Sequence, residues 1–471
     1  MENKKAYVYA LIGQFGPQAI SLVTNIILAR YLLPEAFGTI AVLNVFLSTA
    51  SVLMDSGLGG SLVKEKEITK VDCSTIFVFN ISISSILYLI IFLFSGYIEN
   101  FYGIPNLKNI TRILCLCFVI NSFGLVPKAL LIKDIKFKSL TEINLYSYSL
   151  SSIVAIILGI IYKNVYALLA HQLLNSLFQV LFSVYKSQYK YSSKFSMKSL
   201  KKLFSFGIYT TMISVIDSIY ENIITVFFGK VYNAQQAGYV GQAKKLEELS
   251  TRSIAQTVNN VAFPILVKYR DDRTKFLAES NRIFKTLLAI TAPALFSIAI
   301  FSEEIILVLF GTQWYQSAGY LNLLIFAGIF ILCESLNRNF IKSLTLVNQL
   351  FEITIWKRIV GILLITITAF ITPEHLLHAY ILSSFIGFLF NNRLYSNSIK
   401  ISFWEQLFVM IKILFPSFIY YIIMTILHIE SSFIKIAIAS LFLLVYYWGI
   451  LPMYNIHIIE SIKKKRNNKR V

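Results

Sequence analysis

The stretch RYLLPEAFG, Arg30 to Gly38, interrupts an apolar run just as that run becomes long enough to cross a bilayer. Its proline, glutamate and closing glycine predict a tight turn between two membrane helices. A weaker copy, KVYNAQQAG, returns at Lys230 to Gly238, displaced by 200 positions. Six predicted helices separate the two turns. The copy therefore predicts an internal repeat whose halves have the same orientation in the membrane.

The composition indicates that the solvent of this chain is a bilayer. Of its 471 residues, 56% are apolar and 14% are charged, whereas soluble domains carry about 25% charged residues. Apolar runs long enough to span recur along the chain, for example Ile76 to Ile98, Phe403 to Leu427 and Phe433 to Leu451. The first run follows MENKK without a small-residue cleavage site, so we interpret it as a retained helix and not a signal peptide.

The net charge of +19 does not favour nucleic acid as a partner, because the basic residues are dispersed between apolar runs. The four cysteines lie mostly inside apolar stretches and form no metal or disulfide pattern, so they are interpreted as small apolar fillers. No phosphate-binding loop, metalloprotease motif or nucleophile constellation is present. The sequence therefore predicts no cofactor, no metal and no enzymatic activity.

Apolar length and polar interruptions predict an all-α, polytopic membrane protein of about fourteen spans. Alternate loops are rich in Lys and Arg, which places them, and both termini, in the cytoplasm. No predicted external loop is large enough to hold a catalytic domain. The predicted spans cover 6–29, 36–56, 74–98, 108–127, 139–162, 165–187, 200–229, 237–267, 278–301, 318–345, 350–371, 376–396, 403–427 and 432–455.

The polar, basic segment from Tyr185 to Lys202 divides the first six spans from the rest. We expect two six-helix lobes related by a parallel pseudo-two-fold axis, followed by two further helices. The predicted parts are an N-terminal lobe over 1–188, a cytoplasmic basic linker over 189–199, a C-terminal lobe over 200–398, two additional helices over 399–457 and a basic cytoplasmic tail over 458–471.

Five stretches in order carry a resemblance to a known family. They are ILARYLLPEAFGTIAV, MDSGLGGSLVKEKEIT, VPKALLIKDIKFKSL, NNVAFPILVKYRDD and LFGTQWYQSAGYLNLL. Together they resemble the Wzx-type polysaccharide transporter family, lipid-linked oligosaccharide flippases of the multidrug/oligosaccharidyl-lipid/polysaccharide exporter superfamily. The resemblance implies two six-helix lobes that face a central cavity and move an undecaprenyl-diphosphate-linked glycan across the bacterial cytoplasmic membrane by alternating access.

The chain departs from the family in span seven. Many relatives carry a basic and an acidic residue there, whereas YENIITVFFGK places Glu221 and Ile224 at those positions. The same span holds Asp217 one turn before Glu221. Two carboxylates one turn apart repel each other and burial penalises their charge, so one could take up a proton and serve ion coupling. The alternative is that Glu221 pairs with Lys245 or Arg252.

Span eight places Lys245, Glu248 and Arg252 on one helical face. This stripe could bind a diphosphate, with Arg as a bidentate fork and Lys as a compact charge. It could equally form an internal ion-pair ladder that closes two lobes, or belong to an amphipathic helix that enters the membrane interface, since Lys244 and Glu247 show that the charge is not confined to one face.

Three further features complete the candidate residues. Arg30 tips the outer turn and joins Lys245, Arg252 and Arg338 as a candidate substrate-binding cation. Glu334 and Arg338 stand at i and i+4 in span ten, which favours a local pair; Glu334 joins Asp217, Glu221 and Glu248 as a candidate for ion coupling or gating. Glu374, His375 and His378 have metal-ligand spacing but fall in a short outer loop, which favours solvated side chains.

The resulting hypothesis is a flippase or exporter of an undecaprenyl-diphosphate-linked oligosaccharide, a surface polysaccharide precursor. Its partners would be the lipid-linked substrate, the bilayer, a coupling proton or sodium ion, and polymerases or glycosyltransferases. The alternative within transport is a multidrug or small-cation antiporter of the same superfamily, for which an acidic cavity is expected. A membrane glycan polymerase or ligase is a third reading, disfavoured by the short external loops.

Overall fold

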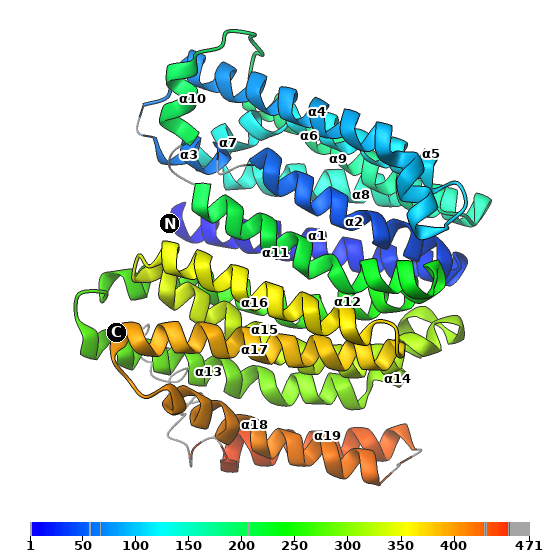
Figure 1. Ribbon diagram of the computed structural model, residues 1–471, viewed down its shortest axis with the longest axis vertical. Helices are drawn as coiled ribbons and strands as arrows, with labels where there is room; N and C mark the ends of the chain where they lie inside the picture. The colour runs from blue at the N-terminus through cyan, green and yellow to red at the C-terminus, as the bar shows by residue number, and fades with distance from the viewer. Residues whose placement is uncertain are drawn as a thin grey trace. The chain divides into compact units, whose positions relative to one another are not determined.

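The computed structural model describes residues 2–55, 58–65, 67–204, 208–427, 429, 431–450 and 452. Within those ranges all regular structure is helical (Figure 1). Some side chains inside the described helices, that of Arg252 among them, lie outside the described part. The all-α prediction is confirmed.

The chain forms two compact units. Unit 1 comprises residues 1–242 and 309–314, and unit 2 comprises 243–308 and 315–471. The boundary between residues 242 and 243 falls inside the helix α12 (Ala234–Lys268). The lobe limits predicted from membrane crossings are a different partition of the chain, and they stay a prediction.

Unit 1 is built from long helices joined by short turns, with α1 packed on α8, α8 on α9, and α2 on α11. Its helices are α1 (Glu2–Tyr31), α2 (Pro34–Asp55), α3 (Leu58–Lys64), α4 (Lys70–Tyr102), α5 (Leu107–Leu114), α6 (Leu116–Ser122), α7 (Leu125–Lys133), α8 (Phe137–Tyr162), α9 (Tyr166–Ser187), α10 (Met197–Phe204), α11 (Ile208–Phe227), η1 (Phe228–Tyr232), the first turns of α12 (Ala234–Lys268) and η2 (Thr312–Trp314).

Unit 2 contains the remainder of α12 and the later helices, with α15 packed on α17, α16 on α17, and α13 on both α15 and α18. These are α13 (Arg273–Ile300), α14 (Ser302–Phe310), α15 (Tyr315–Ser343), α16 (Val347–Thr368), α17 (Pro373–Ile399), α18 (Phe403–Ile426), α19 (Ser432–Val445) and η3 (Tyr446–Ile450).

Helix ends follow from local chemistry. α4 begins at a capping box in which the Thr69 hydroxyl accepts from Asp72 N while the Asp72 carboxylate accepts from Thr69 N. It ends at Gly103, whose φ of 65° is a left-handed conformation that glycine adopts without strain. Pro373 is the first residue of α17. Proline suits this position because a backbone N–H there would have no acceptor within the helix.

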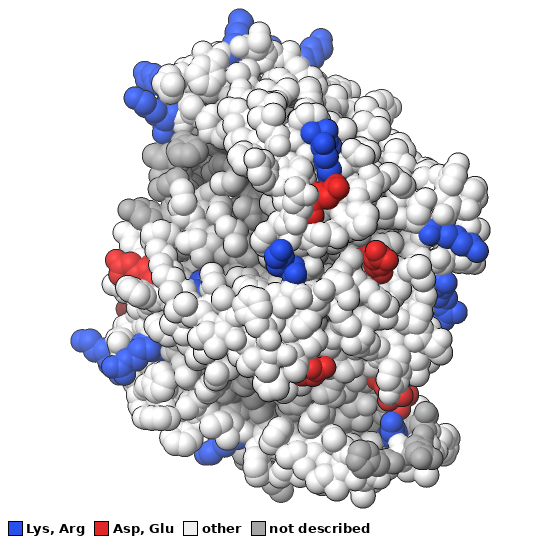
Figure 2. Space-filling view, turned by 45° about the vertical axis from the view of Figure 1, so that its right-hand side comes forward, with Lys and Arg blue, Asp and Glu red and all other residues white. Residues whose placement is uncertain are grey.

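Eight described helices are long and apolar enough to cross a membrane, or nine if the bent pair Leu107–Ser122 and Leu125–Lys133 is one span. The protein is thus a multi-pass membrane protein, and on the face drawn in Figure 2 charged side chains are sparse among uncharged ones. Helices α1, α12, α16 and α17 occupy other predicted spans without meeting the same criteria. Fourteen crossings stay a prediction.

The opening turn and its copy both connect two helices through a link of one or two residues. α1 ends at Tyr31 and α2 begins at Pro34, whereas η1 ends at Tyr232 and α12 begins at Ala234. The two turns also pack on each other in unit 1. A Cβ on Gly38 would lie 1.6 Å from Ala234 O, so only glycine permits this approach.

A segment distant in sequence completes the Arg30 turn. The Trp314 indole Nε1 donates to Ala29 O at 2.8 Å, and its ring meets Phe37 edge-on with centroids 5.2 Å apart. Arg30 Nε donates to Leu309 O at 3.2 Å. Residues 309–314 therefore belong to unit 1, although the helices before and after them belong to unit 2.

Candidate functional site

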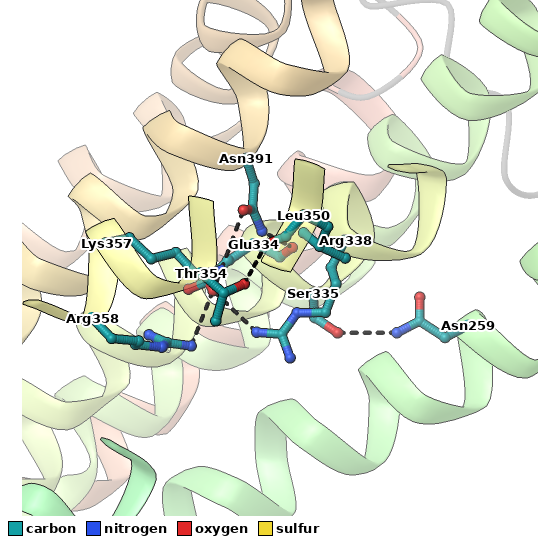
Figure 3. Close-up of polar contacts among 9 residues, drawn as sticks. All are labelled: Asn259, Glu334, Ser335, Arg338, Leu350, Thr354, Lys357, Arg358 and Asn391. Carbon is teal, nitrogen blue, oxygen red and sulfur yellow. Dashed lines mark hydrogen bonds and ion pairs between the residues drawn. The ribbon is translucent and has the colours of Figure 1, made fainter. Parts of the chain in front are cut away.

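Glu334 on α15 lies at the centre of a buried cluster of charges in unit 2 (Figure 3). Its Oε1 accepts from Lys357 Nζ at 2.7 Å, from Arg338 Nη2 at 3.1 Å and from Arg358 Nη2 at 3.2 Å. Lys357 Nζ also donates to Asn391 Oδ1 at 3.2 Å, and Asn391 Nδ2 donates to Glu334 O at 3.2 Å. We call these five residues the Glu334 cluster.

Three helices assemble the Glu334 cluster. Glu334 and Arg338 are one turn apart on α15, Lys357 and Arg358 are consecutive on α16, and Asn391 lies on α17. Small residues let the helices approach, as a Cβ on Gly387 of α17 would lie 2.8 Å from Glu334 Oε2. The local Glu334–Arg338 pair expected from the sequence is present, but it is one part of a larger network.

The cluster has more positive than negative charge. Its four ionisable side chains are one carboxylate and three cations. The Lys357 side chain is 0% exposed and that of Arg358 is 8% exposed, whereas Arg338 is 23% exposed. Burying such charges is costly unless each is paired and hydrogen-bonded, so this arrangement needs every contact around Glu334. Arg338 is the cation of the cluster that is most accessible from outside it.

The charged part of α12 has two faces in unit 2. Lys244, Glu247 and Thr251 are buried. On this face the Thr251 hydroxyl donates to Glu247 Oε1 at 2.6 Å, and a Cβ on Gly328 of α15 would lie 2.4 Å from the same oxygen. α12 therefore packs on α15 through a carboxylate and a glycine.

The predicted stripe lies on the neighbouring face of α12. Lys245 and Glu248 are half-buried, and Lys244 Nζ is 3.8 Å from Glu248 Oε1. This ion pair links the stripe to the packed face. The side chain of Arg252, the third member, lies outside the described residues. Whether the stripe binds substrate stays a prediction.

The acidic pair of span seven lies in unit 1 on α11, the helix that packs on α2. Asp217 is buried and Glu221 is half-buried. Hydroxyl and amide groups surround this part of the α11–α2 contact: Asn222 Nδ2 donates to Ser48 Oγ at 2.9 Å. The role of the pair in ion coupling stays a prediction.

The cations of the two repeat turns are exposed and differ in their partners. Arg30 contacts the Leu309 carbonyl, as described above, whereas Lys230 Nζ donates to Phe101 O at 2.5 Å and lies 4.6 Å from the Phe101 ring centroid. Both side chains tie a turn to another part of unit 1. For Arg30 this contact is a structural role. Its contact with substrate stays a prediction.

Glu374, His375 and His378 lie in the first two turns of α17, whose predicted start was a few residues later. His375 N donates to the N-cap hydroxyl of Thr372 at 3.3 Å. The expectation of a loop for these three residues was therefore wrong: they begin a helix, because Thr372 and Pro373 form a strong helix start.

Sequence reasoning missed Lys357, Arg358 and Asn391. The signal was present, since WKRIV places two consecutive cations inside an apolar run. Ionisable residues in such a run normally face protein or a wet cavity. What the run could not reveal was their common partner, which is 23 and 24 residues earlier on another helix.

Comparison with known proteins places this fold in a family. The family model described as "Polysaccharide biosynthesis protein" matches residues 27–319, more than half of the chain. A Klebsiella pneumoniae protein described as "Uncharacterized membrane protein in cps region" is 24% identical over 71% of this chain and 73% of its own length. The Escherichia coli "Lipopolysaccharide biosynthesis protein WzxC" is 24% identical over 66% of this chain and 63% of its own length.

The solved structures agree on the fold. A "Lipid II flippase MurJ, inward closed conformation" superimposes with a TM-score of 0.77 at 18% identity, over 95% of this chain and 99% of that one. An inward-facing multidrug resistance MATE transporter of the MOP superfamily gives 0.63 at 14% identity, over 84% and 99%. The fold is therefore similar to that of the MurJ and MATE structures. The chain belongs to the polysaccharide biosynthesis protein family, which confirms the resemblance seen in the sequence.

Proposed function

We propose that this protein is a flippase that moves an undecaprenyl-diphosphate-linked oligosaccharide across the bacterial cytoplasmic membrane by alternating access. The observation that carries the proposal is the Glu334 cluster, in which one buried carboxylate contacts three cations. A diphosphate headgroup is anionic, so its passage through a low-dielectric bundle needs cations in the interior. Membership of a polysaccharide biosynthesis family supports the same substrate class.

The sign of the interior charge separates this function from its alternative. An antiporter of drugs or small cations needs an acidic cavity, and the fold alone permits either function. In unit 2 the described cations Lys244, Lys245, Arg338, Lys357 and Arg358 outnumber the carboxylates of Glu247, Glu248 and Glu334 in and around the α12–α15–α16 packing. This balance favours an anionic substrate.

We assign the substrate contacts to Arg338, Lys245 and Arg252, with Arg30 at the outer turn. Arg338 is the accessible arm of the cluster, and a guanidinium can bind a phosphate with two parallel hydrogen bonds. Glu334 then holds Arg338 in place, while Glu248 offsets part of the positive charge of Lys245 and Arg252 on α12. Asp217 and Glu221 would couple transport to a proton or sodium ion.

The proposal also sets the protein's surroundings. Both termini would lie in the cytoplasm, where glycosyltransferases build the lipid-linked glycan. A polymerase or further transferase on the outer side would consume the product. These partners follow from the chemistry of the substrate, which must be assembled on one side and used on the other.

The test is transport in proteoliposomes that contain a fluorescent lipid-linked oligosaccharide, with translocation measured as glycan that becomes accessible to a lectin. Arg338→Gln should reduce the rate by about tenfold or more, the value of one charge-assisted contact. Arg338→Lys should recover only part of it, because a point charge does not reproduce a fork. Arg393→Gln, an exposed cation on α17, is the matched control.

Arg252→Gln and Lys245→Gln should show the same defect with normal protein abundance. Full transport by a protein lacking Arg338, Lys245 and Arg252 would overturn the cationic site. Transport of cationic drugs in place of the glycan lipid would move the protein to the antiporter alternative.

A further inference from the structure

A cavity in unit 2 is separate from the Glu334 cluster. It measures about 690 Å³ and lies where the last turn of α13, α14, the end of α18 and the start of α19 meet. Its polar lining comprises Ser302, Glu303, Glu304, Asn322, Tyr421, Thr425 and Lys435. No member of the proposed substrate site contributes to it.

The polar groups of this cavity are organised by hydrogen bonds. Lys435 Nζ of α19 donates to Glu304 Oε1 at 2.6 Å. The Tyr421 hydroxyl donates to Asn322 Oδ1 at 2.9 Å, and Asn322 Nδ2 donates to Ala299 O at 2.9 Å. These contacts tie the C-terminal helix pair to α13, α14 and α15 around the cavity.

One oxygen in this network lacks a donor. Glu304 Oε2 is buried and accepts no hydrogen bond from the described residues. Buried carboxylate oxygens are normally hydrogen-bonded, and the exceptions point to a missing partner. A rotation of the Glu304 carboxyl group would offer this oxygen to a donor that enters the cavity.

The cavity lies at the ends of two candidate membrane spans. α13 and α18 are both candidate membrane spans, and the cavity is lined at the end of each, by Ile300 and by Met424. The cavity adjoins an apolar cluster: its lining residue Met424 belongs to a core cluster with Tyr420, and the Tyr420 and Phe442 rings of that cluster stack with centroids 4.1 Å apart. A polar cavity beside an apolar cluster matches a molecule with a polar head and hydrocarbon tails.

The charges of the lining residues indicate which kind of lipid headgroup fits the cavity. Glu303 is exposed and Glu304 is partly exposed, and both stand in the first turn of α14, where the helix dipole favours their negative charge. With Lys435 as the one lysine or arginine among the lining residues, the two carboxylates leave the cavity negative. A diphosphate is therefore disfavoured, whereas a head with both an ammonium and a phosphate finds partners of both signs.

We propose that this cavity binds the headgroup of a zwitterionic phospholipid with a primary ammonium, a phosphatidylethanolamine of the surrounding bilayer. The ammonium donates to the carboxylates of Glu303 and Glu304, and Lys435 faces the phosphate. The primary ammonium has three N–H donors, which a quaternary choline lacks. This site is independent of the proposed transport function.

The test is native mass spectrometry of the purified full-length protein titrated with phosphatidylethanolamine, phosphatidylcholine and phosphatidylglycerol of identical acyl chains. The wild-type protein should bind the ethanolamine lipid about tenfold more tightly than the choline lipid, the value of a charge-assisted hydrogen bond. Glu303→Gln and Glu304→Gln should each lower that preference, and the double variant should abolish it.

The controls separate binding from folding. Glu405→Gln removes a carboxylate at the opposite end of α18 and should keep the preference. Glu303 is exposed, so its substitution leaves the packing of α14 intact. Equal affinity of the wild-type protein for the ethanolamine and choline lipids, or tighter binding of phosphatidylglycerol, would overturn the proposal. So would an unchanged preference in the double variant.

Discussion

Gly38 and Gly238 lie against each other, each at the start of a helix that follows a copy of the same turn. A Cβ on Gly38 would be 2.8 Å from Gly238 N, and a Cβ on Gly238 would be 3.2 Å from Gly38 N and 2.0 Å from Pro34 O. The contact is reciprocal, as expected when two repeats meet about a two-fold axis. It explains why glycine is the residue that both copies keep.

Substituting either glycine should destabilise unit 1. Gly38→Ala places a methyl group within 1.6 Å of Ala234 O, so the helices must separate. We expect a loss of about 1–3 kcal/mol or more, the usual cost of overpacking, measured as a lower midpoint of thermal unfolding in detergent. Gly96→Ala on α4 meets nothing within 4 Å and should leave the midpoint unchanged or slightly higher. Equal stability of the Gly38→Ala and Gly96→Ala proteins would contradict the glycine contact.

The charges around Glu334 should behave as one network. Glu334→Gln removes the only carboxylate of the cluster and leaves three cations facing one another, at a cost of about 3–5 kcal/mol. The double variant Glu334→Gln with Lys357→Met should lose less than the sum of the two single variants, because it removes one of the cations that Glu334 neutralises. A double-mutant cycle on thermal or denaturant unfolding measures the coupling. Additive effects would show that Glu334 and Lys357 do not interact.

A second buried pair offers a test without charge. The amides of Asn337 on α15 and Gln406 on α18 exchange two hydrogen bonds of 2.8 Å, and both residues are buried. Asn337→Leu should cost about 1–3 kcal/mol, since it leaves the Gln406 amide unsatisfied. Adding Gln406→Leu should restore part of that stability. If the double variant is less stable than Asn337→Leu alone, the pair is not the reason for the loss.

Ion coupling should depend on the acidic pair of α11. Asp217 is buried and Glu221 is half-buried one turn away, so neutralising either changes the charge of this helix within the membrane. Asp217→Asn and Glu221→Gln should alter the pH dependence of proteoliposome transport. Identical pH profiles for wild type and both variants would leave the pair with a structural role alone.

The orientation predicted from the basic loops can be tested with single cysteines in a cysteine-free protein. Lys108→Cys and Tyr315→Cys should react with an impermeant maleimide in intact cells, whereas Ser193→Cys should react only after permeabilisation. These positions avoid Gly103 and Gly311, whose φ angles of 65° and 96° would strain a cysteine. Labelling of Ser193→Cys in intact cells would invert the topology.

The sequence by itself determined the class of fold, the position of most helices and the two turns of the repeat. These properties are local: apolar length sets a membrane helix, and proline, glycine and capping residues set its ends. The Arg30–Gly38 turn and the start of α15 were predicted within a few residues. The local Glu334–Arg338 pair was also predictable, because i and i+4 positions face each other on any helix.

Only the tertiary structure decided which distant groups meet. It brought Lys357 and Arg358 to Glu334. It packed residues 309–314 against the Arg30 turn. It also buried Lys244 and Glu247 on one face of α12. The physical reason is that membrane helices are apolar on most of their circumference, so periodicity does not define which side faces a neighbour. Close packing of small residues such as Gly328 sets that rotation, and with it the partner of every buried charge.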